Sequence, residues 1–220
     1  MASARTTAAL RVYAGFSLAA ITWRHALDAS ALHDGAPLGG THAIALPLAL
    51  SLGALGGVAV VGLTRALVAR TAWAASLESA LREGLSGTPA RELRALGLAA
   101  ALGEELLFRG AMLPSLAGRV GFPAAAVATA ALFGLLHIPA NRALRPWTAS
   151  AFVMGLVFAL LYRLTGEVLA PLTAHAVINL ENLELLLRPA RTRAAPAGPR
   201  PSLARSAAPP AEGSRPAPGG

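Results

Sequence analysis

Long apolar runs occupy most of the chain and predict helices that cross a membrane. The clearest run covers residues 43–64 and contains no charged side chain. A bilayer core of about 30 Å requires roughly 20 such residues in one helix. The other predicted spans are residues 10–27, 94–113, 122–139, 148–162 and 168–187. We therefore predict an all-α fold, a polytopic membrane helix bundle of about six transmembrane helices.

The first predicted span, residues 10–27, has an alternative interpretation as a signal peptide. Arg5 and Arg11 precede its apolar centre, and the sequence Ala29-Ser30-Ala31 resembles a cleavage site. The distribution of arginines favours a retained helix. With six alternating spans, fifteen arginines fall on one side of the membrane and three on the other. Because cytoplasmic segments carry the excess of basic residues, we predict a multi-pass protein of the inner (plasma) membrane with both termini in the cytoplasm.

Two stretches lie outside the predicted spans. Residues 65–94 combine apolar positions at helical spacing with charged ones, which predicts an interfacial segment. Within it, Thr88 is expected to cap the next helix and Pro89 to occupy its first position. Residues 188–220 contain eight prolines and four glycines, which predicts a disordered tail. The chain thus divides into residues 1–93, a core of residues 94–187, and the tail.

Composition excludes several classes of protein and of chemistry. Apolar residues make up 55% of the chain and charged residues 14%, against about 25% charged residues in an ordinary soluble domain. These values exclude a soluble globular domain and a wholly disordered chain. The net charge is +8, but the tail supplies more than half of it, so it does not indicate a nucleic-acid partner. The chain has neither cysteine nor lysine, which excludes thiolate metal sites, cysteine nucleophiles and lysine Schiff bases.

Polar groups inside predicted spans mark the candidate site, because they are costly to place in lipid. Glu105 and Arg109 are four residues apart, so they share a helix face and can pair. Glu104 points about 100° away from that face. A carboxylate withdrawn from water in this way is suited to act as a general base. The alternative is that this segment is a helix end in the membrane interface.

Two further clusters carry histidine. His137 ends the apolar run 122–139, and His175 and Asn179 share one face of the span 168–187. Taken singly, His137 is more typical of a core or interfacial histidine, and the pair on 168–187 can equally form a polar stripe that joins helices. Together, an acid pair, a histidine and a histidine–asparagine pair lie on three separate predicted spans of one bundle, a set that can be compared with the known chemistries of intramembrane proteases.

Other intramembrane protease chemistries do not fit the sequence. It has no H-E-x-x-H zinc motif, and no serine lies in a G-x-S-x-G context. Its aspartates, Asp28 and Asp34, both lie in the first predicted loop, so an aspartyl dyad within the membrane is excluded. Glutamate as the base, with histidine and asparagine as its partners, is the set that remains.

The three clusters resemble the motifs of the CAAX-protease and bacteriocin-processing (CPBP, or Abi) family of intramembrane proteases. The motif E-E-x-x-x-R corresponds to Glu104-Glu105…Arg109, F-x-x-x-H to Phe133…His137, and H-x-x-x-N to His175…Asn179, in the family's order. The resemblance covers residues 98–187. It implies an endopeptidase, with a cavity open to the cytoplasm, that cleaves a membrane-associated protein or peptide precursor.

The resemblance also implies roles for these residues. Glu104 would activate water with the help of His137, while His175 and Asn179 would stabilise the oxyanion and Arg109 would hold Glu105. Whether a metal cofactor takes part stays open at this point. Glu104, His137 and His175 could instead supply three ligands to Zn²⁺. The absence of a dedicated metal signature favours a metal-free, glutamic-type enzyme.

The implied partners are a membrane-associated substrate and the lipid bilayer. The resemblance allows prenylated C-termini, but a prokaryote-like composition favours bacteriocin or signal-peptide precursors, or the C-terminal sorting tags of surface proteins. A second hypothesis is a non-catalytic membrane scaffold or immunity protein that binds a peptide in the same polar cavity. A third, a small transporter or proton relay, predicts inverted repeats, and the sequence contains none that we detect.

Overall fold

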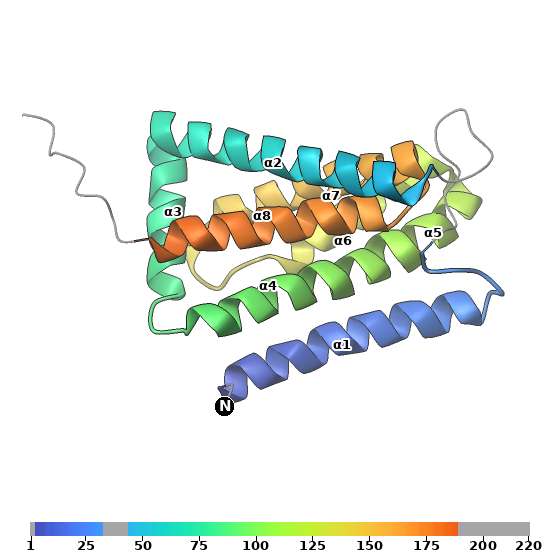
Figure 1. Ribbon diagram of the computed structural model, residues 1–220, viewed down its shortest axis with the longest axis horizontal. Helices are drawn as coiled ribbons and strands as arrows, with labels where there is room; N and C mark the ends of the chain where they lie inside the picture. The colour runs from blue at the N-terminus through green and yellow to red at the C-terminus, as the bar shows by residue number, and fades with distance from the viewer. Residues whose placement is uncertain (1–2, 33–43, 189–220) are drawn as a thin grey trace, which may run out of the picture. The chain divides into compact units, whose positions relative to one another are not determined.

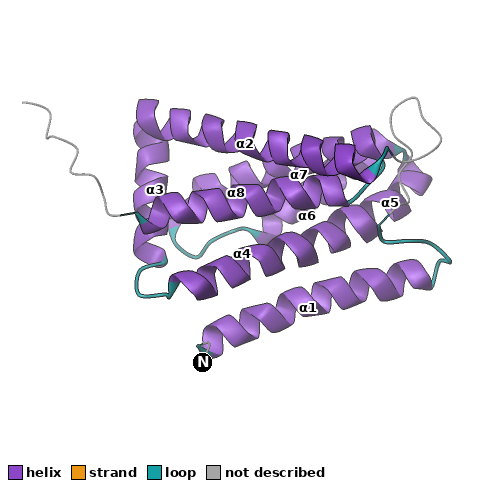
Figure 2. Ribbon diagram, in the orientation of Figure 1, coloured by secondary structure: helices purple, strands orange, loops and turns teal. Residues whose placement is uncertain are grey.

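The computed structural model describes residues 3–32 and 44–188, and within these residues all regular structure is helical (Figure 2). Residues 1–188 form one compact unit. The predicted disordered tail, residues 188–220, lies almost wholly outside the described residues. The elements in chain order are α1 (Ala4–His25), α2 (Leu46–Arg70), α3 (Ala72–Gly84), α4 (Ala90–Glu105), a π-helical segment η1 (Leu106–Met112), α5 (Leu113–Val120), α6 (Phe122–Leu136), a 3₁₀ turn η2 (Arg142–Leu144), α7 (Arg145–Thr165) and α8 (Leu169–Leu187).

The all-helical prediction is confirmed for the described residues. Two helices, α2 with 25 residues and α7 with 21, are long and apolar enough to cross a membrane by themselves. The apolar helix α6 is shorter, with 15 residues, and ends at Leu136. Pro139 follows soon after, and a proline disfavours helical backbone at the residue before it. The number of spans and their direction stay predictions.

Large apolar side chains face outward from the bundle. On α1 and α2, Leu18, Leu55 and Leu63 each expose 60% or more of their surface, and other leucines and valines of both helices are also exposed. Exposure of so many large apolar side chains is unusual for a soluble monomer. In a bilayer the same surface meets lipid chains at no cost, and the helices satisfy their own backbone hydrogen bonds there. The exposure pattern is therefore that of a membrane protein.

The first helix packs closely on the fourth. Gly103 of α4 lies so near the backbone of Tyr13 that a Cβ at Gly103 would be 2.6 Å from the Tyr13 carbonyl oxygen. At the start of α1, the Glu92 carboxylate accepts hydrogen bonds from the Ser3 backbone N–H (3.2 Å) and from the Thr6 hydroxyl. Helix α1 thus contacts α4 and η1, and its retention in the mature protein stays a prediction.

The cap predicted for α4 is wrong. The N-cap residue is Pro89, no side chain caps the helix, and α4 begins at Ala90. Thr88 instead continues the turn after α3, where its N–H donates to the Leu85 carbonyl oxygen (3.2 Å). The helix therefore starts later than the capping pattern indicated.

Glycines bring α2 and α8 close together. A Cβ at Gly57 would lie 2.9 Å from the Ala174 carbonyl oxygen and 2.9 Å from the Val177 Cβ. Gly53 approaches the Ala170 carbonyl in the same way. These pairs advance in the same direction along both helices, so α2 and α8 run parallel, side by side as in Figure 1. The position of α8 thus depends on small residues in α2.

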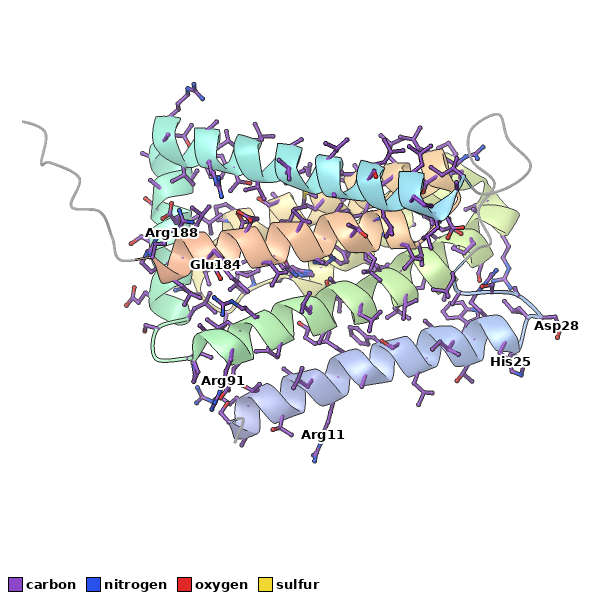
Figure 3. All side chains as sticks on the ribbon, viewed as in Figure 1. Arg11, His25, Asp28, Arg91, Glu184 and Arg188 are labelled. Carbon is purple, nitrogen blue, oxygen red and sulfur yellow. The ribbon has the colours of Figure 1, made fainter. Side chains whose placement is uncertain are left out.

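Charged groups gather at one end of the bundle. Arg65 of α2 pairs with Glu181 of α8 (2.9 Å), and the Nε of Arg94 in α4 donates to Glu184 of α8 (2.9 Å). Helix α3 lies across this end, and its Arg82 donates to carbonyl oxygens at the C-terminus of α8, including that of Leu185 (3.0 Å) (Figure 1). Figure 3 shows Arg91, Glu184 and Arg188 at this end, with His25 and Asp28 at the opposite one.

Candidate active site

The first and third motifs meet at a buried carboxylate. Glu105 has no exposed surface, and its Oε1 accepts hydrogen bonds from the Arg109 Nη1 (3.1 Å) and the His175 Nδ1 (2.8 Å). The pairing of Glu105 with Arg109 predicted from their spacing is confirmed. The bond from His175 joins α4 to α8, helices that run side by side in opposite directions (Figure 1). Motifs 70 residues apart therefore form one site.

The carboxylate of Glu104 lies near Nε2, the other ring nitrogen of His175. Because the Glu105 carboxylate can only accept, we place the His175 proton on Nδ1. The His175 Nε2 then lies 3.8 Å from the Glu104 Oε2. This separation exceeds a direct hydrogen bond, and a water molecule can contact both atoms at once. Glu104 and His175 are 7% and 8% exposed, so such a water would be largely shielded from bulk solvent.

Arg109 is fully buried, and its guanidinium contacts groups from several helices around the site. Its Nη2 donates to the Gly155 carbonyl oxygen of α7 (2.9 Å). Its guanidinium carbon lies 5.6, 4.8 and 5.3 Å from the ring centroids of Phe108, Phe133 and Phe158. Aromatic faces attract a guanidinium, and more strongly where water is excluded. The carboxylate, the carbonyl and the three rings together make a buried arginine tolerable.

A change of helix type separates the carboxylates from Arg109. The π-helical segment η1 begins at Leu106, directly after Glu105. A π-turn pairs each N–H with the carbonyl five residues back, which interrupts the α-helical ladder, and such segments are frequent at functional sites. Arg109 nonetheless keeps its bond to Glu105 across this segment. No feature of the sequence indicated the π-helix.

His137 lies at the end of α6, next to Phe133. Its Nδ1 is 2.7 Å from the Phe133 carbonyl oxygen, and because a carbonyl only accepts, Nδ1 carries the proton and Nε2 is the basic nitrogen. Its ring contacts the rings of Phe133 (4.6 Å between centroids) and Trp147 (6.5 Å). Phe133 in turn meets His175 edge-on at 6.3 Å. The second motif therefore joins the site through Phe133.

Asn179 is placed differently from the other motif residues. Its Nδ2 donates to the Gly97 carbonyl oxygen of α4 (2.9 Å). Gly97 lies two helical turns before Glu104, so the structure does not bring this amide to the carboxylates. In this arrangement Asn179 fastens α8 to α4, one turn from His175.

The sequence analysis missed two residues of the site. The ring of Phe158 stacks on His175, with centroids 4.9 Å apart and planes at 21°. Gly155 supplies the carbonyl that Arg109 binds, and its own lack of a side chain lets Ala130 of α6 approach. An aromatic and a glycine in an apolar helix give no chemical signal, so only the packing reveals them.

The residues considered as zinc ligands do not form a ready site. Within residues 3–32 and 44–188, no group of three or more His, Cys, Asp or Glu lies close enough to hold a metal ion. Glu104 and His175 adjoin, but His137 reaches them only through the ring of Phe133. This geometry does not fit a three-ligand zinc site, and the steps proposed below use protein groups and water.

Comparison with known proteins finds one family model that matches part of the chain. No curated protein and no solved structure matches the chain. Residues 88–180 match the family model described as type II CAAX prenyl endopeptidase Rce1-like. This segment runs from the turn before α4 into α8 and contains all three motifs. Residues 88–180 are therefore similar to the CAAX-protease family, the resemblance that the motifs indicated.

Proposed function

We propose that the protein is an intramembrane endopeptidase of the glutamic type, which cleaves a membrane-associated protein or peptide precursor. One observation carries the proposal: Glu104, Glu105, Arg109 and His175 form a single buried cluster across α4, η1 and α8. A charged cluster at this depth is costly to maintain and is typical of a functional site. The family match supports a CAAX-type protease.

In the proposed reaction, Glu104 removes a proton from a water molecule held between its carboxylate and His175. The water oxygen then bonds to the scissile carbonyl carbon, and the carbonyl oxygen becomes an oxyanion. When this tetrahedral intermediate collapses, the C–N bond breaks and Glu104 returns its proton to the leaving amine. The products are a free carboxyl group and a free amine, and Glu104 ends in its starting state.

The other residues hold and stabilise this arrangement. His175 is oriented by the bond from its Nδ1 to Glu105, and it would stabilise the oxyanion by donating from Nε2 when that nitrogen also carries a proton. Arg109 fixes Glu105. The resemblance implies that His137 helps Glu104 to activate the water, and in the structure His137 contacts the site through the ring of Phe133. Asn179 was expected to share the oxyanion with His175; its bond to Gly97 supports a role in aligning α8 with α4.

We further propose that the arginine-rich end of the bundle faces the cytoplasm, so that the chain is a multi-pass protein of the plasma membrane with both termini inside. The interfacial helix α3 would then lie at the cytoplasmic surface, beside the C-terminus of α8. A substrate segment would enter from this side. An enzyme in this orientation would cleave membrane-anchored precursors whose cleavage site lies in the cytoplasm or within the membrane.

The test compares a strain that carries the wild-type protein with one that carries Glu104→Gln at equal expression. The amide keeps the shape of the carboxyl group but cannot accept the proton from water. We expect membrane-anchored precursors with an uncut terminal segment to accumulate only in the Glu104→Gln strain. Glu83→Gln is the matched control, because it makes the same change at an exposed position of α3 and should behave as wild type.

The outcomes separate the hypotheses. Accumulated precursors would name the substrate, and the purified protein should cleave them while the Glu104→Gln variant does not. Full cleavage by purified Glu104→Gln would contradict the role of Glu104. A function that survives the substitution, with no precursor in either strain, would favour the non-catalytic peptide-binding protein.

A further inference from the structure

Helix α8 carries a third polar residue on the face that holds His175 and Asn179. Asn182 follows His175 by seven residues, so the two side chains fall within about 20° of each other around the helix. Asn182 lies outside residues 88–180, the segment that matches the family model. The proposed reaction gives it no part.

The contacts of the preceding turn show where Asn182 points. It lies one turn beyond Ile178 and Asn179, and its direction around the helix falls between theirs. Ile178 packs in a core cluster with Phe158 of α7. Asn179 bonds Gly97 of α4. Asn182 is therefore turned toward the interior of the bundle, between α7 and α4.

The amide of Asn182 has an open acceptor. Its Oδ1 is buried and, within the described part of the chain, has no hydrogen-bond partner. Asn179, on the same face, does have a partner in the Gly97 carbonyl. Buried polar atoms in native proteins are almost always paired, so this oxygen is free for a donor from outside the chain. The residue as a whole is only partly buried, which lets such a donor reach it.

Asn182 lies between the carboxylates and the arginine-rich end of the bundle. Its neighbours Glu181 and Glu184 form ion pairs with arginines of α2 and α4 at that end. At 1.5 Å per residue, Asn182 is about 10 Å from His175 along the helix axis. An extended peptide advances about 3.3 Å per residue, so about three of its residues span this distance.

We propose that Asn182 binds the main chain of the substrate, a peptide segment held extended between the carboxylates and the arginine-rich end. The amide group carries an acceptor and two donors in one plane, which match the N–H and C=O of a peptide unit. The bond lies about three residues from the scissile peptide and is independent of the substrate's side chains. This inference rests on the proposed function, since it requires a peptide whose scissile bond lies at Glu104 and His175.

Asn182→Leu tests the proposal, because it removes the amide and keeps a side chain of nearly the same shape. With the precursor that accumulates in the Glu104→Gln strain as substrate, we expect KM to rise about tenfold, the effect of losing one hydrogen bond. The kcat should stay unchanged, because a bond made equally to substrate and transition state acts on KM alone.

Thr173→Val is the matched control on the same helix. It also replaces a polar side chain by an apolar one of the same shape, but on the face of α8 that packs against Gly53 of α2. This variant should leave both KM and kcat unchanged.

Unfolding of the purified full-length variants in detergent separates substrate binding from a structural role. Because the Asn182 acceptor is unpaired in the described part of the free protein, Asn182→Leu should leave the melting temperature equal or raised. Asn179→Leu, which removes the bond to Gly97, should lower it. A fall for Asn182→Leu as large as that for Asn179→Leu would show that Asn182 holds the helices together, and would overturn the proposal.

The kinetic outcomes distinguish this inference from the proposed function. If the wild-type protein cleaves the precursor and Asn182→Leu cleaves it with the same KM, Asn182 does not bind the substrate, while the proposed function stands. If the wild-type protein cleaves nothing, the proposed function fails, and this inference fails with it. A raised KM with equal or higher stability supports both.

Discussion

A guanidinium with no exposed surface lies at the centre of the site. Isolated charges cannot be buried without a large cost, so Arg109 depends on its partners. They are the Glu105 carboxylate, the Gly155 carbonyl and three aromatic rings. Glu105 also accepts a hydrogen bond from His175. The ion pair that stabilises the buried Arg109 therefore also orients His175. Removing Arg109 alone and removing both Glu105 and Arg109 should therefore affect stability differently, while both changes should reduce activity.

Arg109→Leu should destabilise the protein by about 3–5 kcal/mol, because it leaves Glu105 buried without its cation. The measurement is thermal or denaturant unfolding of the purified protein in detergent. Arg65→Leu is the control, since it removes an ion pair whose side chains are 48% and 50% exposed. Exposed pairs contribute about 0–1 kcal/mol, so this variant should unfold close to wild type.

The double variant Glu105→Leu/Arg109→Leu separates the two roles. Replacing both members of a buried pair by apolar residues is often neutral, so much of the lost stability should return. Cleavage should not return, because His175 loses the acceptor that fixes its Nδ1. A double variant that cleaved as well as wild type would contradict the orienting role of Glu105.

Single residues differed in how far the sequence revealed them. The Glu105–Arg109 pair follows from a spacing of four on any helix, and it was predicted correctly. The partners of His175 and Asn179 depend on how α8 lies against α4, which spacing within one helix does not specify. Arg24 lies near the end of the predicted span 10–27, but the sequence did not reveal that it is 4% exposed or that its Nη1 donates to the Ser115 hydroxyl (3.4 Å). Long-range partners of this kind appear only in the packed fold.

Among the helices, α2 sets the position of α8 through its glycines. Gly57→Ala should destabilise the protein by about 1–3 kcal/mol, the usual cost of overpacking, because the new methyl group meets the Ala174 carbonyl and Val177 at 2.9 Å. Displacement of α8 also moves His175, so cleavage should fall with stability. Unfolding in detergent and cleavage of the accumulated precursor measure the two effects.

Gly62→Ala is the control within the same helix. A Cβ at Gly62 has no atom within 4 Å, so this substitution should leave stability equal or slightly raised, because alanine favours a helix over glycine. If both alanine variants behaved alike, the close approach of α2 and α8 at Gly57 would not be what holds α8 in place.

Helix positions could be predicted well from the apolar runs, and helix ends less well. Each predicted span overlaps helical structure, because a long apolar segment without breakers favours a helix. The span 94–113, however, contains the change from α4 to η1, and α7 extends beyond residues 148–162 at both ends. The pattern of apolar and polar side chains does not indicate a π-helical segment. A helix can also continue past its apolar run, where charged side chains reach water or a partner.

Across the molecule, arginines mark one end of the bundle. At this end Glu92 joins α4 to the start of α1, Glu181 joins α8 to α2, and Glu184 joins α8 to α4. Helix α3 is joined to α8 by Arg82. Arg24 and Arg163 belong to the C-terminal ends of α1 and α7 and lie away from it. The six predicted spans divide Arg65, Arg82 and Arg94 from Arg24 and Arg163 in the same way, and the orientation of the bundle in the membrane stays a prediction.

Cysteine labelling can test this orientation directly, because the chain has no cysteine and any introduced one is unique. Arg91 and His25 are exposed and lie at opposite ends of the bundle (Figure 3). With a membrane-impermeant maleimide, intact spheroplasts should label His25→Cys and spare Arg91→Cys, whereas inside-out vesicles should show the reverse. Detergent-solubilised protein, labelled at both sites, is the control for reactivity. Labelling of Arg91→Cys from outside would invert the topology, and substrates would then have to reach the site from the opposite face. Labelling of both from one side would mean that the arginine-rich end and the opposite end lie in the same compartment, which a bundle crossing the bilayer does not allow.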